Sequence, residues 1–185
     1  MDLPPLDDVP FVPVPGMLFS DETGAPFEKC CICSGHLLAD GTGYLIEKGF
    51  HRGETAFEYA ICFDCHGRIK SELSQASLKR VEHYFDERVD MVARRRGLIA
   101  AAPDDPAPWF SKCLLSGDDL GDEYQVFAQC DGGDLLFGYL PYAIGGRELE
   151  NLAQILSKET RERLDDFIDD VLGVPGDGLR LPVMI

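Results

Sequence analysis

The sequence predicts an α+β protein of two tandem units, with short strands ahead of a long helix in each unit. Three observations lead to this prediction. Apolar residues recur at helical spacing late in each half of the 185-residue chain, β-prone segments precede both stretches, and the chain matches itself at an offset of 83 residues. We predict an extended arm over 1–22, a first unit over 23–97, a linker over 98–108 and a second unit over 109–185.

The first 16 residues are rich in proline, which stands at positions 4, 5, 10, 13 and 15. Proline breaks helices and lacks the amide donor that a central strand needs. The same segment carries apolar side chains, among them Leu3, Leu6, Phe11 and Val14. We therefore expect an extended arm that docks on a surface, either of its own body or of a neighbouring molecule.

The spacing of apolar residues predicts two long helices. Residues 65–96 contain no proline and one glycine, and Gly97 then follows three arginines, which suit the negative end of a helix. Residues 147–172 form the second predicted helix, ended by Gly173 and Pro175. The apolar stripes are Ile69, Leu73, Ala76, Val81, Tyr84, Phe85, Val89 and Val92 in the first helix, and Leu149, Leu152, Leu156, Leu164, Phe167, Ile168 and Val171 in the second.

Short segments bounded by glycine and aspartate precede each predicted helix. They are Tyr44 to Ile46 and Phe57 to Ile61 in the first unit, and Tyr124 to Phe127 and Leu135 to Phe137 in the second. Aromatic and β-branched residues between such turn formers are typical of strands. We expect these segments to form small hairpins.

The self-match at 83 residues includes short identical words. It places Phe27, Lys29 and Cys30 on Phe110, Lys112 and Cys113, and Tyr59-Ala60-Ile61 on Tyr142-Ala143-Ile144. The apolar stripes of the two predicted helices coincide at the same offset. This pattern favours a duplicated unit over chance similarity.

Seven cysteines include two CxxC pairs, Cys30 with Cys33 and Cys62 with Cys65. Two such knuckles supply four thiolates in the tetrahedral arrangement that zinc prefers. In a chain without an export signal, paired CxxC motifs favour metal binding over disulfides. We predict one structural zinc ion per chain, held by Cys30, Cys33, Cys62 and Cys65.

The order of knuckle, hairpin and a helix that brings the last two ligands resembles the treble-clef group of zinc-binding domains. The resemblance covers about residues 27–90 and implies a fold and a metal. It does not imply an activity, because many unrelated proteins share this layout.

Other interpretations of the cysteines stay open. Cys31 could replace Cys30 as a ligand, and His36, His51 and His66 are reserve ligands. Iron could take the place of zinc, since both bind four sulfurs. Residues 62–66 also match the CxxCH motif of haem attachment, and a CxxC pair can act as a redox dithiol, but neither explains both pairs.

The second unit is predicted to bind no metal. At the offset of 83, Cys30 corresponds to Cys113, but Cys33, Cys62 and Cys65 correspond to Ser116, Gly145 and Glu148. One thiolate cannot hold a tetrahedral ion, so an apolar core must stabilise this unit. We interpret Cys113 and Cys130 as buried apolar residues.

The formal net charge is −16, and residues 101–185 alone carry 17 acidic and 6 basic groups. Such a surface attracts basic proteins and repels phosphate backbones. No stretch approaches the roughly 20 apolar residues that cross a bilayer, and no signal peptide opens the chain. We expect a soluble, cytoplasmic protein. Its expected partner is a basic protein of unknown identity, and homo-oligomer formation stays open.

No nucleophile elbow, P-loop or dinucleotide fingerprint occurs in the chain. A site closed by four thiolates has no open coordination position for a substrate. We therefore predict a non-enzymatic zinc-binding protein that serves in protein interaction or assembly. The alternatives are a nucleic-acid-binding module that uses the basic face of helix 65–96, and an enzyme with a site between the two units. The basic groups concerned are Arg68, Lys70, Lys79, Arg80, Arg88 and Arg94 to Arg96.

Overall fold

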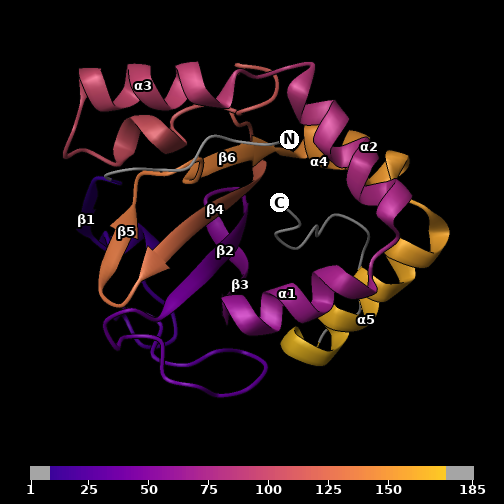
Figure 1. Cartoon of the computed structure of the whole chain (residues 1–185), viewed down its shortest axis with the longest axis horizontal. Helices are drawn as coiled ribbons and strands as arrows, with labels where there is room; N and C mark the ends of the chain where they lie inside the picture. Colours follow the sequence, from indigo (N-terminus) through magenta and orange to yellow (C-terminus); the bar gives the residue numbers. More distant parts are fainter. Residues whose placement is uncertain (1–8, 174–185) are drawn as a thin grey trace.

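The computed structural model describes residues 9–173, which form a mixed α+β fold with a six-stranded antiparallel sheet (Figure 1). The strands are β1 (Phe11–Pro13), β2 (Gly43–His51), β3 (Glu54–Cys62), β4 (Glu123–Asp131), β5 (Asp134–Leu136) and β6 (Tyr142–Gly145). The α-helices are α1 (Phe63–Glu72), α2 (Gln75–Asp86), α3 (Met91–Ala101), α4 (Gly146–Ile155) and α5 (Lys158–Leu172). Two 3-10 turns, η1 (Gly16–Leu18) and η2 (Ala107–Phe110), complete the described part.

The sheet is centred on the pairing of β2 with β4, which come from opposite halves of the chain. All nine residues of β2 pair with β4, from Gly43 opposite Asp131 to His51 opposite Glu123. On the other side of β2 lies β3, and β5 and β6 pair with opposite ends of β4. The expected hairpins are confirmed as β2–β3 and β4–β5, but the strands of both halves belong to one sheet.

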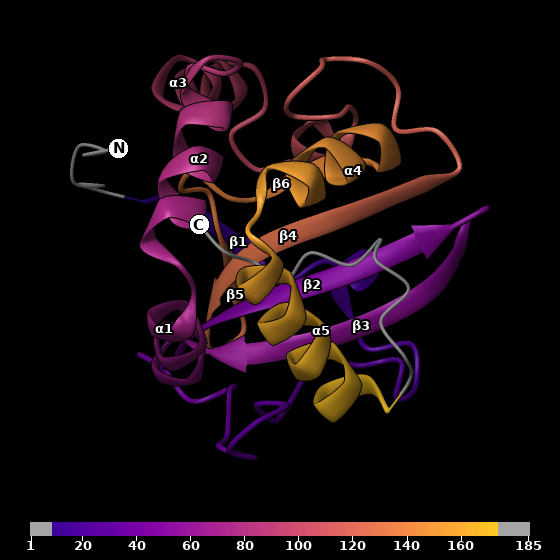
Figure 2. The same ribbon diagram turned by 90° about the vertical axis from the view of Figure 1, so that its right-hand side faces the viewer.

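Four helices, α1, α2, α4 and α5, lie over one face of this sheet (Figures 1 and 2). Their packing crosses between the halves. Phe85 of α2 contacts Tyr142 of β6 at a ring-centroid distance of 6.2 Å. Phe167 of α5 meets Tyr59 of β3 edge to face, at 5.5 Å. The buried apolar residues of both halves consequently form one hydrophobic cluster.

The prediction of one helix over residues 65–96 is wrong, because the chain breaks there twice. Leu73 ends α1 in an extended conformation, and the Ser74 side chain then accepts a hydrogen bond from the Ser77 amide at the start of α2. Asp90 accepts a hydrogen bond from the Ala93 amide at 2.8 Å and starts α3. Serine and aspartate compete for backbone donors in this way and favour helix starts over helix interiors.

The predicted helix over residues 147–172 is also two helices. Leu156 is extended, and the Ser157 side chain caps α5 by accepting from the Thr160 amide at 3.2 Å. Gly97 does not end a helix, because it lies inside α3, and residues 98–101 of the expected linker are helical. The stop signal Pro175 lies outside the described residues.

Arg94 and Arg95 bind carbonyl groups elsewhere in the fold and do not serve a helix end. Nη2 of Arg94 donates to the carbonyls of Trp109 and Pro141, both at 3.0 Å, and Nε of Arg95 donates to that of Phe137 at 2.9 Å. Burial lowers the pKa of Arg94 to about 10. These bonds hold α3 against η2 and against the segment between β5 and β6.

The described part of the arm, from residue 9 onward, lies on the chain's own body. Its β1 strand pairs with β5 at the edge of the sheet, where a proline-rich strand is tolerated. Val14 and Leu18 are buried. The ammonium of Lys48, almost fully buried, donates to the carbonyl of Phe19 at 2.7 Å and to Asp21 at 2.9 Å. Residues 1–8 lie outside the described part.

Helix positions repeat along the chain. Helix α4 begins and ends 83 residues after α1, and α5 begins 83 residues after α2. The starts of α2 and α5 touch through reciprocal hydrogen bonds: the Ser74 amide donates to Thr160 Oγ1 at 3.2 Å, and the Ser157 amide donates to Ser77 Oγ at 2.9 Å. Because Ser77 and Thr160 are almost fully buried, this contact joins the two helix pairs in the interior.

We expect Ser77→Ala and Thr160→Val each to lower the free energy of unfolding by about 1–3 kcal/mol, because each removes a buried hydroxyl that accepts from a half-buried amide. The double variant should lose less than the sum of the two, since the hydroxyls belong to one network. Urea unfolding measures all three. Ser111→Ala, at an exposed hydroxyl, is the control and should change stability by less than about 0.5 kcal/mol. Full additivity would contradict the contact.

Candidate metal centre

The four cysteines of the two CxxC pairs form one cluster. The Sγ atoms of Cys30, Cys33, Cys62 and Cys65 all lie within 4.8 Å of one another, and those of Cys33 and Cys62 are 3.8 Å apart. Four sulfurs at about 2.3 Å around one tetrahedral zinc ion stand about 3.8 Å from each other. The cysteines are therefore positioned to bind one metal ion.

The first pair lies in a tight turn. The Cys30 amide donates to the Gly35 carbonyl at 2.9 Å, and the Ser34 amide donates to the Cys30 carbonyl at 3.0 Å. Ser34 takes a positive φ of 59°, which closes the turn. The Cys31 amide donates to the Ala60 carbonyl at 2.9 Å and so fixes the turn against β3.

The second pair lies where β3 passes into α1. Cys62 is the N-cap residue of α1, and Cys65 lies in the first helical turn. The positive end of the helix dipole favours thiolates at this position. The four cysteines differ in exposure: Cys30 and Cys65 are buried, Cys62 is half-buried and Cys33 is exposed.

Nearby donors oppose the cost of burying negative charge on the sulfurs, although burial still raises the pKa of Cys62 and Cys65. Burial by itself raises the pKa of Cys30, but amides of Cys33, Cys62 and Ile32 outweigh this effect and lower it to about 6. The Arg68 guanidinium donates to Cys65 Sγ at 2.9 Å and the Gly35 amide to Cys33 Sγ at 3.4 Å. Such outer donors orient metal-binding thiolates and balance their charge.

The structure places the other candidate ligands outside the cluster. Cys31 is not a member, and burial raises the pKa of its thiol. His51 pairs with Glu123 instead, and neither His36 nor His66 joins the cluster. Within residues 9–173, no other group of three or more His, Cys, Asp or Glu side chains gathers around a common point. The acidic pairs at 118–119 and 165–166 therefore belong to no such group.

The offset of 83 residues relates the cysteine cluster to a place in the second half of the chain. The backbone there makes a similar amide-to-sulfur bond, but three of the four cysteines are missing. The Gly145 amide donates to Cys113 Sγ at 3.4 Å, as the Cys62 amide donates to Cys30 Sγ at 3.5 Å. A cavity of about 180 Å³ lies there and is lined by residues that include Ser116 and Glu148. The Glu148 carboxylate accepts from the Tyr84 hydroxyl at 2.7 Å, so it is already engaged.

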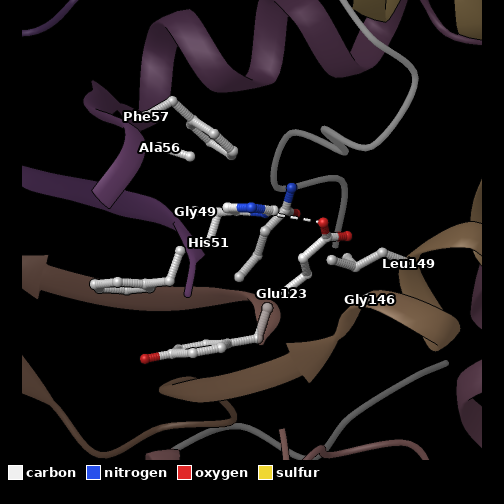
Figure 3. A pocket seen from close by; sticks show the side chains of 10 residues that line it. Gly49, His51, Ala56, Phe57, Glu123, Gly146 and Leu149 are labelled. Carbon is white, nitrogen blue, oxygen red and sulfur yellow. Dashed lines mark hydrogen bonds and ion pairs between the residues drawn. The ribbon is translucent and has the colours of Figure 1, made fainter. Parts of the chain in front are cut away.

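A larger cavity, of about 220 Å³, lies where the β2–β3 turn meets the starts of β4 and α4 (Figure 3). His51 and Glu123 point toward one another at its edge, with 2.9 Å between Nδ1 and Oε1. From the sequence, His51 is only a reserve metal ligand, and its pairing with Glu123 is a finding of the structure. No local motif marks two residues that are 72 positions apart.

The chain matches no protein-family model, no curated protein and no solved structure. None of the helices within residues 9–173 has the length and apolar character to cross a membrane. The cysteine cluster and the cavity beside His51 are the features from which we infer function.

We expect Cys33→Ser to abolish stoichiometric metal binding, because the substitution removes one of four thiolates. Cys31→Ala should keep one metal ion per chain, since Cys31 stands outside the cluster although it is adjacent in sequence. Elemental analysis of the purified variants gives the ratio. Loss of metal in Cys31→Ala with retention in Cys33→Ser would show that Cys31 is a ligand and that the ligand set is different.

Proposed function

We propose that this protein is a non-enzymatic zinc-binding protein in which one structural zinc ion stabilises a protein-interaction or assembly module. The observation that carries the proposal is the closed set of four thiolates. Four protein ligands complete a tetrahedron, and no position is left for a substrate or an activated water. The role of the metal is then to hold the knuckle at 30–33 against the start of α1.

Zinc is the metal we propose because of the donor set and the sulfur spacing. Soft thiolates select zinc or iron over hard cations such as magnesium or calcium. A tetrahedron of four thiolates on a knuckle and a helix start is typical of structural zinc. The sequence of knuckle, β2–β3 hairpin and α1 supports assignment to a treble-clef-like unit.

We also propose that the chain arose from tandem copies of such a unit, the second without metal. The common offset of α1 with α4 and of α2 with α5 supports this idea. The matching amide-to-sulfur bonds at Cys30 and Cys113 support it independently. The four thiolates of one copy are replaced in the other by one cysteine, Ser116, Gly145 and Glu148.

The acidic second half is the proposed partner-facing surface. Helix α5 carries Asp165, Asp166, Asp169 and Asp170, and the pKa of Asp165 is raised by burial and by the charge of Asp169. A crowded set of carboxylates costs free energy that a basic partner relieves. The carboxylates of α5 support association with a basic protein, and we propose α5 as the site of contact.

The basic groups offered for nucleic-acid binding are largely engaged within the protein. Arg68 binds Cys65, Arg80 binds the Ile155 carbonyl, and Arg88 binds the Tyr84 carbonyl. Arg94 and Arg95 bind carbonyls as described above. A phosphate backbone needs cations that are free to contact it, so these contacts favour protein interaction over nucleic-acid binding.

Cobalt(II) substitution tests the structural role of the metal. We expect the cobalt protein to show the visible bands of a tetrahedral thiolate site and to keep them unchanged when imidazole is added, because no coordination position is open. The matched control is Cys31→Ala, which keeps all four ligands and should show the same bands with the same insensitivity to imidazole. A saturable change in the unsubstituted protein would reveal an open position and overturn the structural role.

Charge variants test the interaction surface. We expect the protein to retain a basic partner in pull-down experiments, and replacement of the four α5 aspartates by asparagine to abolish retention. The control is four neutral substitutions at exposed acidic residues of the first half, Glu22, Glu28, Asp40 and Glu54. Equal loss of partner retention in both variants would show that retention depends on net charge and not on the α5 surface. Binding of labelled DNA or RNA that weakens steeply with salt would favour the nucleic-acid alternative.

A further inference from the structure

The cavity beside His51 lies where both halves of the chain contribute walls. Gly49 and Phe57 come from the β2–β3 hairpin, and Glu123, Gln125 and Leu149 come from β4 and α4. Figure 3 shows Phe57 and Leu149 on opposite sides of the His51–Glu123 pair. The cavity therefore has apolar walls and a polar group between them.

Two glycines line this cavity. The Phe57 ring lies directly on Gly49, where a Cβ atom would overlap it. Gly146, the first residue of α4, packs closely on Glu123, since a Cβ atom at this position would lie 3.2 Å from the Glu123 Cβ atom. These close contacts shape the wall of the cavity.

The pairing of His51 with Glu123 fixes what the cavity offers a ligand. The two residues are direct cross-strand partners in the β2–β4 register. A carboxylate can only accept, so in the neutral imidazole of His51 the proton lies on Nδ1 and Nε2 presents a lone pair. No described residue contacts Nε2 by a hydrogen bond or ion pair, and about half of the imidazole is exposed.

The chemistry of the walls favours a cationic donor on an aliphatic stem. The Glu123 carboxylate is an acceptor, as is Nε2 in the neutral His51 imidazole, and no Lys or Arg among residues 9–173 lines the cavity. The Phe57 ring can interact with a cation, and Leu149 can pack against methylene groups. The volume is below the roughly 300–1,000 Å³ of pockets for drug-sized ligands, which suits a single side chain or a small amine. The net charge of −16 attracts a cation to the mouth.

We propose that this cavity binds a primary ammonium group on an aliphatic stem, supplied by a lysine side chain or by a free alkylamine. The ammonium donates to the Glu123 carboxylate, which Nδ1 of His51 holds in place, and the stem lies between Phe57 and Leu149. A lysine from the basic partner would specify one contact of the proposed interaction, and this assignment rests on the proposed function. The binding site itself does not depend on the metal, which lies at the other end of β3.

The test uses the full-length, metal-loaded protein and n-pentylamine as the probe, with 1-pentanol and pentanoate as neutral and anionic analogues. Amide and imidazole NMR shifts report binding at Gly49, His51 and Glu123. We expect saturable shifts with pentylamine, and weaker binding of both analogues by about tenfold or more, because a hydrogen bond from a charged donor is stronger than one from a neutral donor. Equal binding of 1-pentanol would overturn the ammonium assignment.

Two matched pairs of variants locate the site. Glu123→Gln should weaken pentylamine binding about tenfold or more, whereas Asp122→Asn, with the same change of net charge next to the cavity, should alter it by less than about twofold. Ala56→Trp, at an exposed wall position, should block the cavity, and Ala101→Trp at the end of α3 should not. Equal effects within either pair would contradict the proposal.

A second arm separates the two sources of the ammonium group. Nα-acetyl-lysine amide is compared with the same molecule acetylated at Nε. Binding of the first but not the second, at an affinity like that of pentylamine, identifies a lysine side chain. Binding of pentylamine alone identifies a free amine and removes the link to the partner while the metal-based function stands. No binding of either amine overturns the site.

Discussion

The pairing of β2 with β4 is the constraint on which the rest of the structure depends. It joins nine residues of the first half to nine of the second in one register, and it places β3 on one side and β5 and β6 on the other. Each half then supplies a helix that packs on a strand of the other, through Phe85 on Tyr142 and Phe167 on Tyr59. Because the apolar surface of each half is buried largely by the other, the burial that stabilises the fold is shared.

The two candidate sites lie at opposite ends of this central unit. The cysteine cluster forms where β3 ends and α1 begins, beside the first residues of β2. The cavity forms at the other end of β2, where His51 faces Glu123. Phe63 and Gly146 are the first residues of α1 and α4, but the Phe63 ring covers Gly43 of β2, whereas Gly146 packs on Glu123 of β4. The two halves have similar frames and different chemistry at their ends.

Local chemistry was predictable from the sequence, and long-range pairing was not. The four-cysteine cluster followed from spacing alone, since a tetrahedral ion needs four soft ligands and two CxxC pairs supply them. The strands around Tyr44 and Tyr124 were recognised from local composition, but composition does not specify that β2 pairs with β4, and so His51 was not connected with Glu123. The long helices were wrong for a different reason. The caps Ser74, Asp90 and Ser157 were visible in the sequence, but the apolar stripe stays in phase across each break and suggested continuity.

The central claim is that a metal ion at one end of the first half stabilises a core that both halves share. Hydrogen exchange by mass spectrometry tests it most directly, on the full-length protein with its metal and after removal of the metal by a chelator. We expect amides of β2, β4, α1 and α5 to lose protection together, because β2 pairs with β4 and α5 packs on β3. Loss of protection confined to the first half, with β4 to α5 still protected, would contradict a shared core and show that the second half folds alone.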